Sequence, residues 1–196
     1  MKLPFARTIS FIFNPLIVII FAPFFLIYKT THNITSASHW TVYTLIFLLL
    51  LAVFVIVAVK KKIFTDLDVS KREQRPLIFL ISILFTLLYI AGLVFLHGPF
   101  ILFTLAFGII LGIAVVSIIN KRIKASVHVA TITALIWAVA IGYGGYYLFL
   151  LLLIPLVAWS RLATKRHTLS EIFVGAGVGS FLSLSIYVAV KLIFHK

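Results

Sequence analysis

The sequence contains no cysteine, and only four of its 196 residues are acidic. The absence of cysteine excludes disulfides, thiolate metal sites and cysteine nucleophiles. Charged residues of both signs make up 11% of the chain, whereas soluble domains contain about a quarter. Hydrophobic residues account for 63%, and a chain of this length cannot bury so much apolar surface in water. The composition therefore excludes a soluble globular protein and predicts a membrane protein.

Long apolar runs separated by short polar segments divide the chain into membrane spans. A spanning helix needs about 20 mostly apolar residues, so the sequence predicts an all-α, polytopic transmembrane helix bundle of about seven spans. We expect a single domain over residues 1–196. No small-residue cleavage site follows the first run, which therefore reads as a retained span and not as a signal peptide. The expected spans are residues 9–28, 40–59, 77–96, 100–119, 126–143, 146–159 and 171–194.

The 17 Lys and Arg residues give the chain a net charge of +13. They lie in short clusters between apolar runs, which indicates membrane topology and anionic lipid headgroups and not nucleic acid. With seven spans, the basic residues gather on one face, and by the positive-inside rule this face is cytoplasmic. We expect an integral protein of the plasma membrane with the N-terminus inside and the C-terminus outside. On the other face the basic residues are Lys29, Lys191 and Lys196.

Three segments of the basic face carry the chemistry: residues 71–76, 124–128 and 160–171. Two spans separate each segment from the next, so all three are expected on the same side of the membrane. Together they hold cations, hydroxyls, two histidines and two carboxylates, Glu73 and Glu171. Guanidinium and ammonium groups with hydroxyls are suited to an oxyanion such as phosphate.

The third segment has the most specific spacing. Ser160-Arg161 is followed after five residues by His167, and after three more by Glu171. On a helix, residues four apart share a face, so the Glu171 carboxylate can accept an imidazole N–H, fix the tautomer and leave the other nitrogen to attack phosphorus. A purely structural interpretation also fits, because Thr168-x-x-Glu171 is a capping box. The spacing alone leaves both open.

The order of the three segments resembles the type 2 phosphatidic acid phosphatases, a family of membrane enzymes with the motifs K-x6-R-P, P-S-G-H and S-R-x5-H-x3-D. Arg75-Pro76 ends the first segment as the first motif ends. Ser126 and His128 stand where the serine and histidine of the second motif belong. The third segment matches the last motif except at its final position, Glu171. The resemblance covers residues 71–171.

This sequence also departs from the family's pattern. Asp68 stands seven residues before Arg75, where the family has lysine, and Lys71 is the candidate substitute. Ala125 and Val127 replace the proline and glycine of the second motif, and Val is less free than Gly to curl around a phosphate. Glu171 replaces aspartate. These changes indicate a divergent branch.

The resemblance implies a six-helix phosphatase-like core and hydrolysis of a lipid phosphate or diphosphate through a phosphohistidine, with no cofactor and no metal. His167 would be the nucleophile, Glu171 would orient it, and His128 would protonate the leaving oxygen. The implied partners are membrane lipids and the lipid-phosphate substrate. The residues implied in binding the phosphoryl oxygens are Lys71, Arg75, Ser126, Arg161 and Lys124, the last of which is also a simple topology signal.

Two alternatives remain open. Asp66 and Asp68 ahead of Gln74-Arg75-Pro76 are similar to the acidic loop of intramembrane prenyltransferases, which use magnesium-diphosphate; that class normally needs two acid-rich loops, and this chain has one. The other alternative is a non-catalytic membrane protein on a degenerate phosphatase fold. No nucleic-acid partner is expected, and a homo-oligomer is compatible with the sequence.

Overall fold

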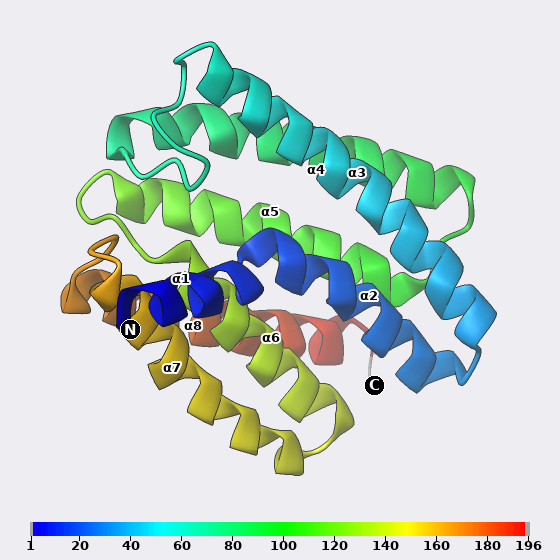
Figure 1. The fold of residues 1–196 in the computed structure, drawn as a ribbon. Helices are drawn as coiled ribbons and strands as arrows, with labels where there is room; N and C mark the ends of the chain where they lie inside the picture. The colour runs from blue at the N-terminus through cyan, green and yellow to red at the C-terminus, as the bar shows by residue number, and fades with distance from the viewer. Residues whose placement is uncertain (1, 195–196) are drawn as a thin grey trace. The chain divides into compact units, whose positions relative to one another are not determined.

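The computed structural model describes residues 2–194, and every regular element in this range is a helix (Figure 1). The expected all-α fold is confirmed. Lys196, one of the basic residues counted above, lies outside the described residues. The helices are α1 Lys2–Ile12, α2 Pro15–Thr31, α3 Ile34–Lys60, η1 Arg72–Gln74, α4 Arg75–Phe95, α5 Phe100–Asn120, α6 Val127–Tyr143, η2 Gly145–Leu152, α7 Leu153–Ala163 and α8 Leu169–Phe194.

Five of these helices are long and apolar enough to cross a membrane, and α1 with α2 makes a sixth if the bent pair is one span. Many large apolar side chains on them are exposed, such as Phe95 at 82% and Phe107 at 61%. Exposed apolar surface on this scale, on helices of spanning length, is typical of contact with lipid. The protein is therefore an integral membrane protein. The five candidate spans are Ile34–Lys60, Arg72–Phe95, Phe100–Asn120, Gly145–Ala163 and Leu169–Leu192.

The first expected span is broken. α1 and α2 meet at a bend of 43°. Pro15 lacks the backbone N–H and fixes its own backbone angle, which suits the first position of a helix. Asn14 caps the new helix, because its Oδ1 accepts a hydrogen bond from Leu16 N at 3.0 Å. The helical segment also begins at Lys2, well before the expected start at residue 9.

The fifth expected span is short. α6 has 17 residues, about 26 Å at 1.5 Å per residue, against a hydrocarbon core of about 30 Å. Eight of its side chains are buried, among them Val129, Ile132 and Ile136. A helix enclosed in this way by protein does not have to match the thickness of the bilayer. The count of seven spans stays a prediction.

Two other spans begin differently from the expectation. α3 starts at Ile34, six residues before the expected Trp40, because Asn33 caps it by accepting a hydrogen bond from Ser36 N at 2.9 Å. The expected span 146–159 is the 3₁₀ helix η2 followed by α7, together Gly145–Ala163. The tighter 3₁₀ helix rises about 2.0 Å per residue, so the segment reaches farther than an α-helix of equal length.

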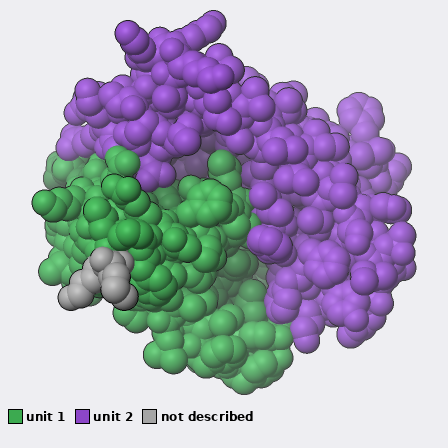
Figure 2. Space-filling model, viewed as in Figure 1, with its two compact units in different colours: residues 1–18, 118–196 green, residues 19–117 purple. Residues whose placement is uncertain are grey.

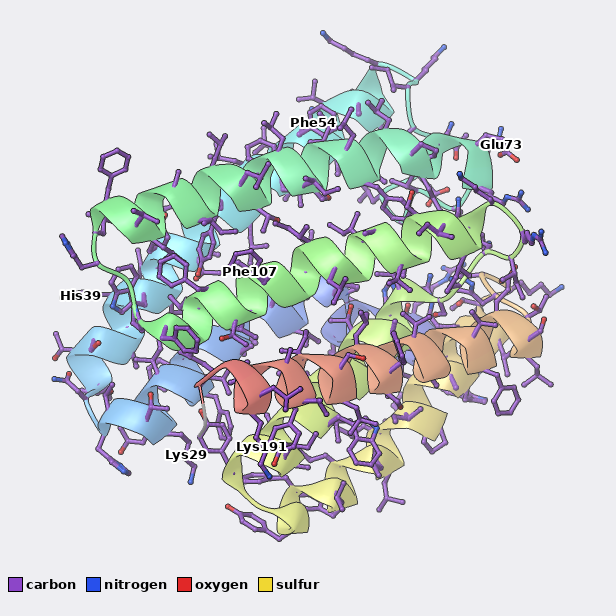
Figure 3. All side chains as sticks on the ribbon, turned by 180° about the vertical axis from the view of Figure 1, so that it is seen from behind. Lys29, His39, Phe54, Glu73, Phe107 and Lys191 are labelled. Atoms are coloured by element: carbon purple, nitrogen blue, oxygen red, sulfur yellow. The ribbon has the colours of Figure 1, made fainter. Side chains whose placement is uncertain are left out.

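The chain forms two compact units, coloured separately in Figure 2. Unit 2 comprises residues 19–117. Its larger core joins α2, α3, α4 and α5 through buried side chains that include Ile27, Ala37, Leu93 and Leu102. Within this unit, Lys29 and His39 lie at one end and Glu73 at the other (Figure 3). Polar groups thus stand at opposite ends of long apolar helices, as a membrane requires.

The polar loop between α3 and η1 is folded onto unit 2. Phe64 is 2% exposed and packs in a small core with Val55 and Ala58 of α3. The Asp66 Oδ1 atom accepts hydrogen bonds from Asp68 N at 3.0 Å and Ser70 Oγ at 2.9 Å. The carboxylate of Asp66 therefore has a structural part within the loop.

Unit 1 comprises residues 1–18 and 118–196. Its core cluster includes Val129, Ile132 and Ile136 of α6, Val157 of α7 and Ile172 of α8. α6 contacts both α7 and α8, and α1 packs against α7 (Figure 1). The helix α6 is thus the centre of this unit.

Close contact between α6 and α8 depends on two glycines. A Cβ at Gly175 would lie 2.6 Å from the carbonyl oxygen of Ser126, and one at Gly179 would lie 2.3 Å from that of Ala130. One turn farther on, Ser183 Oγ donates to Ala134 O. Positions rise together along both helices, so α6 and α8 run parallel with their N-termini at the same end.

This packing yields the first prediction. Gly179→Ala should lower thermal stability in detergent, because the added methyl meets a backbone carbonyl that cannot move aside, and overpacking of this kind costs about 1–3 kcal/mol. Gly177→Ala is the matched control on the same helix, since nothing lies within 4 Å of its Cβ position. Its melting temperature should equal or slightly exceed that of the wild type, because alanine has a higher helix propensity than glycine. Equal melting temperatures for the two variants would contradict the contact.

Candidate functional site

Two of the three predicted segments come together at one end of unit 1. The backbone N–H of Ser126, just before α6, donates to the carbonyl oxygen of Glu171 in the first turn of α8 at 3.0 Å. Lys124 Nζ donates to the carbonyl oxygen of Arg166 at 2.8 Å. Segments 124–128 and 160–171, which lie apart in the sequence, therefore form one site.

The turn between α7 and α8 sets the spacing of the third segment. α7 ends in a Schellman motif: Arg166 N donates to Arg161 O at 3.0 Å and Lys165 N to Leu162 O at 2.9 Å. Lys165 takes the left-handed conformation that this motif requires, with φ of 54°. His167 N also donates to Arg161 O, at 3.3 Å. The five residues between Arg161 and His167 thus form a turn that brings the backbone N–H of His167 to the carbonyl oxygen of Arg161.

His167 is held by Glu171. The Nδ1 atom of His167 lies 2.8 Å from Oε2 of Glu171, and the histidine side chain is 3% exposed. A carboxylate only accepts hydrogen bonds, so Nδ1 carries the proton and the lone pair of the neutral ring is on Nε2. The capping box is present as well, because the same Oε2 accepts from Thr168 N at 3.2 Å. Glu171 therefore makes the contact of a capping box as well as the contact with His167, and its catalytic role stays a prediction.

Arg161 lies in the last turn of α7 and is 3% exposed. Its Nη1 donates to Ser10 Oγ of α1. Its carbonyl oxygen accepts hydrogen bonds from the backbone N–H groups of Arg166 and His167. A single residue thus supplies a buried guanidinium to the site and anchors the turn that carries His167.

Ser126 and His128 come from the start of α6. Ser126 is fully buried, and within residues 2–194 its hydroxyl has no hydrogen-bond partner. Serine in this capping position normally accepts a hydrogen bond from the helix backbone, but here the side chain makes no such bond. A buried hydroxyl is stable only with a hydrogen-bond partner, which a water molecule or a phosphoryl oxygen can supply. His128, two residues later, is 7% exposed.

The electrostatics of this end suit an anion. The N-termini of α6 and α8 both lie here, and each carries a positive partial charge and backbone N–H groups that no carbonyl of the helix accepts. Arg161 adds a full positive charge. No group of three or more histidines, cysteines, aspartates or glutamates in the described part of the chain could hold a metal ion. The residues present fit an oxyanion such as phosphate.

Lys71 and Arg75, the predicted phosphate-binding residues of the first segment, belong to unit 2. Lys71 is exposed and precedes η1, whereas Arg75 begins α4 and is 6% exposed. The Arg75 Nε atom donates to Val69 O at 3.5 Å, at the limit of a hydrogen bond. The phosphate-binding role that the resemblance implies for these two residues stays a prediction.

The structure adds one residue and gives another a different environment. Ser10 contacts the site arginine and was not predicted, because nothing local in the sequence connects positions 151 residues apart. The one feature of the sequence that could have pointed to Ser10 is that it is a polar residue in the apolar stripe of α1.

Lys124, predicted to bind phosphate, donates a hydrogen bond from its ammonium group to the carbonyl oxygen of Arg166. It therefore supports the turn that carries His167.

Comparison with known protein families, with curated proteins and with solved structures found no match.

The Schellman motif yields the second prediction. Lys165→Gly should keep or raise the melting temperature in detergent, because glycine adopts a positive φ without a steric penalty. Lys165→Val should lower it, since a β-branched residue is strongly disfavoured there, and it should also disturb the position of His167. Both variants lose the same exposed charge, so a difference between their melting temperatures reports on the backbone conformation and not on the charge. A valine variant as stable as the glycine variant would contradict the motif.

Proposed function

We propose that this integral membrane protein hydrolyses a lipid phosphate or diphosphate through a phosphohistidine formed on His167. The observation that carries the proposal is the 2.8 Å contact between His167 Nδ1 and Glu171 Oε2 in a buried setting. That contact prepares the other ring nitrogen as a nucleophile. The buried Arg161 and the hydroxyl of Ser126 supply charge and a hydrogen bond for phosphoryl oxygens.

In the first half of the reaction, Nε2 of His167 attacks phosphorus and the bond from phosphorus to the lipid oxygen breaks. His128 gives its proton to that leaving oxygen, so the lipid departs as a neutral alcohol, or as a monophosphate when the substrate is a diphosphate. The ring of His167 becomes positively charged as it binds phosphorus, and the Glu171 carboxylate stabilises that charge. Arg161, Ser126 and the two helix N-termini bind the phosphoryl oxygens throughout the reaction.

In the second half, water attacks the phosphohistidine. His128, now without its proton, accepts one from this water as the bond between phosphorus and Nε2 breaks. Inorganic phosphate leaves, and both histidines return to their starting states. One residue thus acts as acid and then as base, as microscopic reversibility requires.

A lipid substrate is supported by where the site lies. It is built at the ends of helices whose sides expose large apolar residues, such as Phe173 at 72% and Phe181 at 63% on α8. The end of a spanning helix lies near the level of lipid headgroups. A phosphate carried by a lipid reaches such a site while its apolar chains stay in the bilayer.

The third prediction concerns the nucleophile. His167→Ala should abolish phosphate release from a panel of lipid phosphates and diphosphates in detergent, and His128→Ala should be nearly as damaging. Glu171→Gln should lower the rate, because an amide stabilises the charged ring poorly, whereas Glu171→Asp should retain activity. The loss of general acid–base function in His128→Ala is expected to cost about 10²–10⁴-fold.

The matched control is His39→Ala, which removes an exposed histidine of unit 2. It should keep wild-type activity. A chelator should also leave the rate unchanged, since the site residues themselves neutralise the phosphate. Wild-type activity in His167→Ala would overturn the mechanism, and loss of activity in chelator would favour the magnesium-diphosphate chemistry of a prenyltransferase.

We also propose that the protein resides in the plasma membrane and that the site faces the cytoplasm. Fourteen of the 17 Lys and Arg residues share one face of a seven-span arrangement, and short loops with such a bias normally stay in the cytoplasm. These residues are Lys2, Arg7, Lys60, Lys61, Lys62, Lys71, Arg72, Arg75, Lys121, Arg122, Lys124, Arg161, Lys165 and Arg166.

The fourth prediction tests this orientation. The chain has no cysteine, so single cysteines at the exposed positions Ser38, Lys61 and Lys121 give unambiguous labelling. In intact cells, a membrane-impermeant thiol reagent should label only Ser38→Cys. Lys61→Cys and Lys121→Cys should react after permeabilisation. The reverse pattern would place the site outside, and labelling of only one of the two lysine positions in intact cells would rule out the seven-span arrangement.

A further inference from the structure

We infer that Ser10 of α1 is a positioning residue that holds the Arg161 guanidinium for substrate phosphate. The inference rests on the proposed function, in which Arg161 binds phosphoryl oxygens. The contact is direct: Arg161 Nη1 donates a hydrogen bond to Ser10 Oγ, across 151 residues of sequence. Arg161 is 3% exposed, so the guanidinium has few water molecules to replace this partner.

The position of Ser10 on its helix supports a dedicated role. Ala6, Ile9 and Phe13 face the interior of unit 1, the first two with exposed fractions of 0% and 8%. Ser10 falls on the same stripe, because residues at these spacings share one face of a helix. An apolar residue would be expected there. A hydroxyl in an apolar stripe is unfavourable unless it has a hydrogen-bond partner, and Arg161 is that partner.

The helix α1 is itself fixed in place. It packs along α7, the helix that carries Arg161, and the rings of Phe5 and Trp159 lie 5.9 Å apart. Ser10 is therefore attached to a supported element and not to a loose terminus. This makes α1, with α6, α7 and α8, the fourth helix that contributes to the site.

Ser10 should act on substrate binding more than on the chemical step. It contacts the side chain of Arg161, whereas the turn that carries His167 is attached to the backbone of Arg161. A guanidinium binds phosphoryl oxygens in the substrate and in the transition state alike. Loss of such an interaction raises KM and leaves kcat nearly unchanged. A serine with a purely structural role would change the stability of the protein, and its loss would not raise KM while leaving kcat unchanged.

The fifth prediction compares Ser10→Ala, Ser10→Thr and Thr8→Ala. Ser10→Ala should raise KM for the lipid phosphate, and the inhibition constant of orthovanadate, about tenfold, because a hydrogen bond to a charged group is lost. Ser10→Thr keeps the hydroxyl and should restore both values. Thr8→Ala is the matched control, since Thr8 is exposed on the same helix and its hydroxyl bonds Pro4 O at 3.2 Å.

The outcomes separate this inference from the proposed function. Unchanged KM and vanadate inhibition in Ser10→Ala, or a fall in kcat alone, would overturn the role of Ser10 while the phosphatase activity of the wild type stands. A KM that rises equally in Thr8→Ala would also overturn it. A wild-type protein that releases no phosphate from any lipid and does not bind vanadate, measured as a vanadate-induced rise in melting temperature, would overturn both.

Discussion

The close packing of α6 against α8 is the constraint on which the site depends. Gly175 and Gly179 let the backbones approach until Ser126 N reaches the carbonyl of Glu171 at 3.0 Å. Small residues make such approaches possible in membranes, where apolar side chains gain little by leaving lipid for protein. Because the two helices run parallel, their positive ends and the residues beside them meet at one place. Without this contact, nothing would hold the segment that contains Ser126 against the segment that contains His167.

Around that contact, ordinary helix-end chemistry becomes a candidate catalytic arrangement. The Schellman motif at the end of α7 returns the chain to Arg161, and the capping box at the start of α8 places Glu171 against His167. Each device satisfies backbone groups that would otherwise lack partners. Here the same bonds also determine the tautomer of His167 and hold its backbone at the carbonyl of Arg161. Structural and functional demands therefore fall on the same few residues.

Much of this could be predicted from the sequence, since apolar runs of about 20 residues indicate spans directly and the spacing of His167 and Glu171 implies their contact. The spacing could not separate a capping box from a catalytic pair, because the geometry is common to both and Glu171 Oε2 contacts both Thr168 N and His167 Nδ1. The break at Asn14 lies inside an apolar run that by itself predicts one continuous span. The contact between Ser10 and Arg161, and the 3₁₀ start of Gly145–Leu152, depend on tertiary packing that leaves no local pattern.

The central claim is that phosphate is transferred to His167, and trapping the intermediate tests it most directly. Wild-type protein in detergent is mixed with a ³²P-labelled lipid phosphate, stopped within milliseconds in base, and digested. The account predicts a label that is stable in base, labile in acid and located on the peptide that contains His167, and it predicts no label in His167→Ala. Label on another residue, or turnover by His167→Ala at the wild-type rate, would contradict the account.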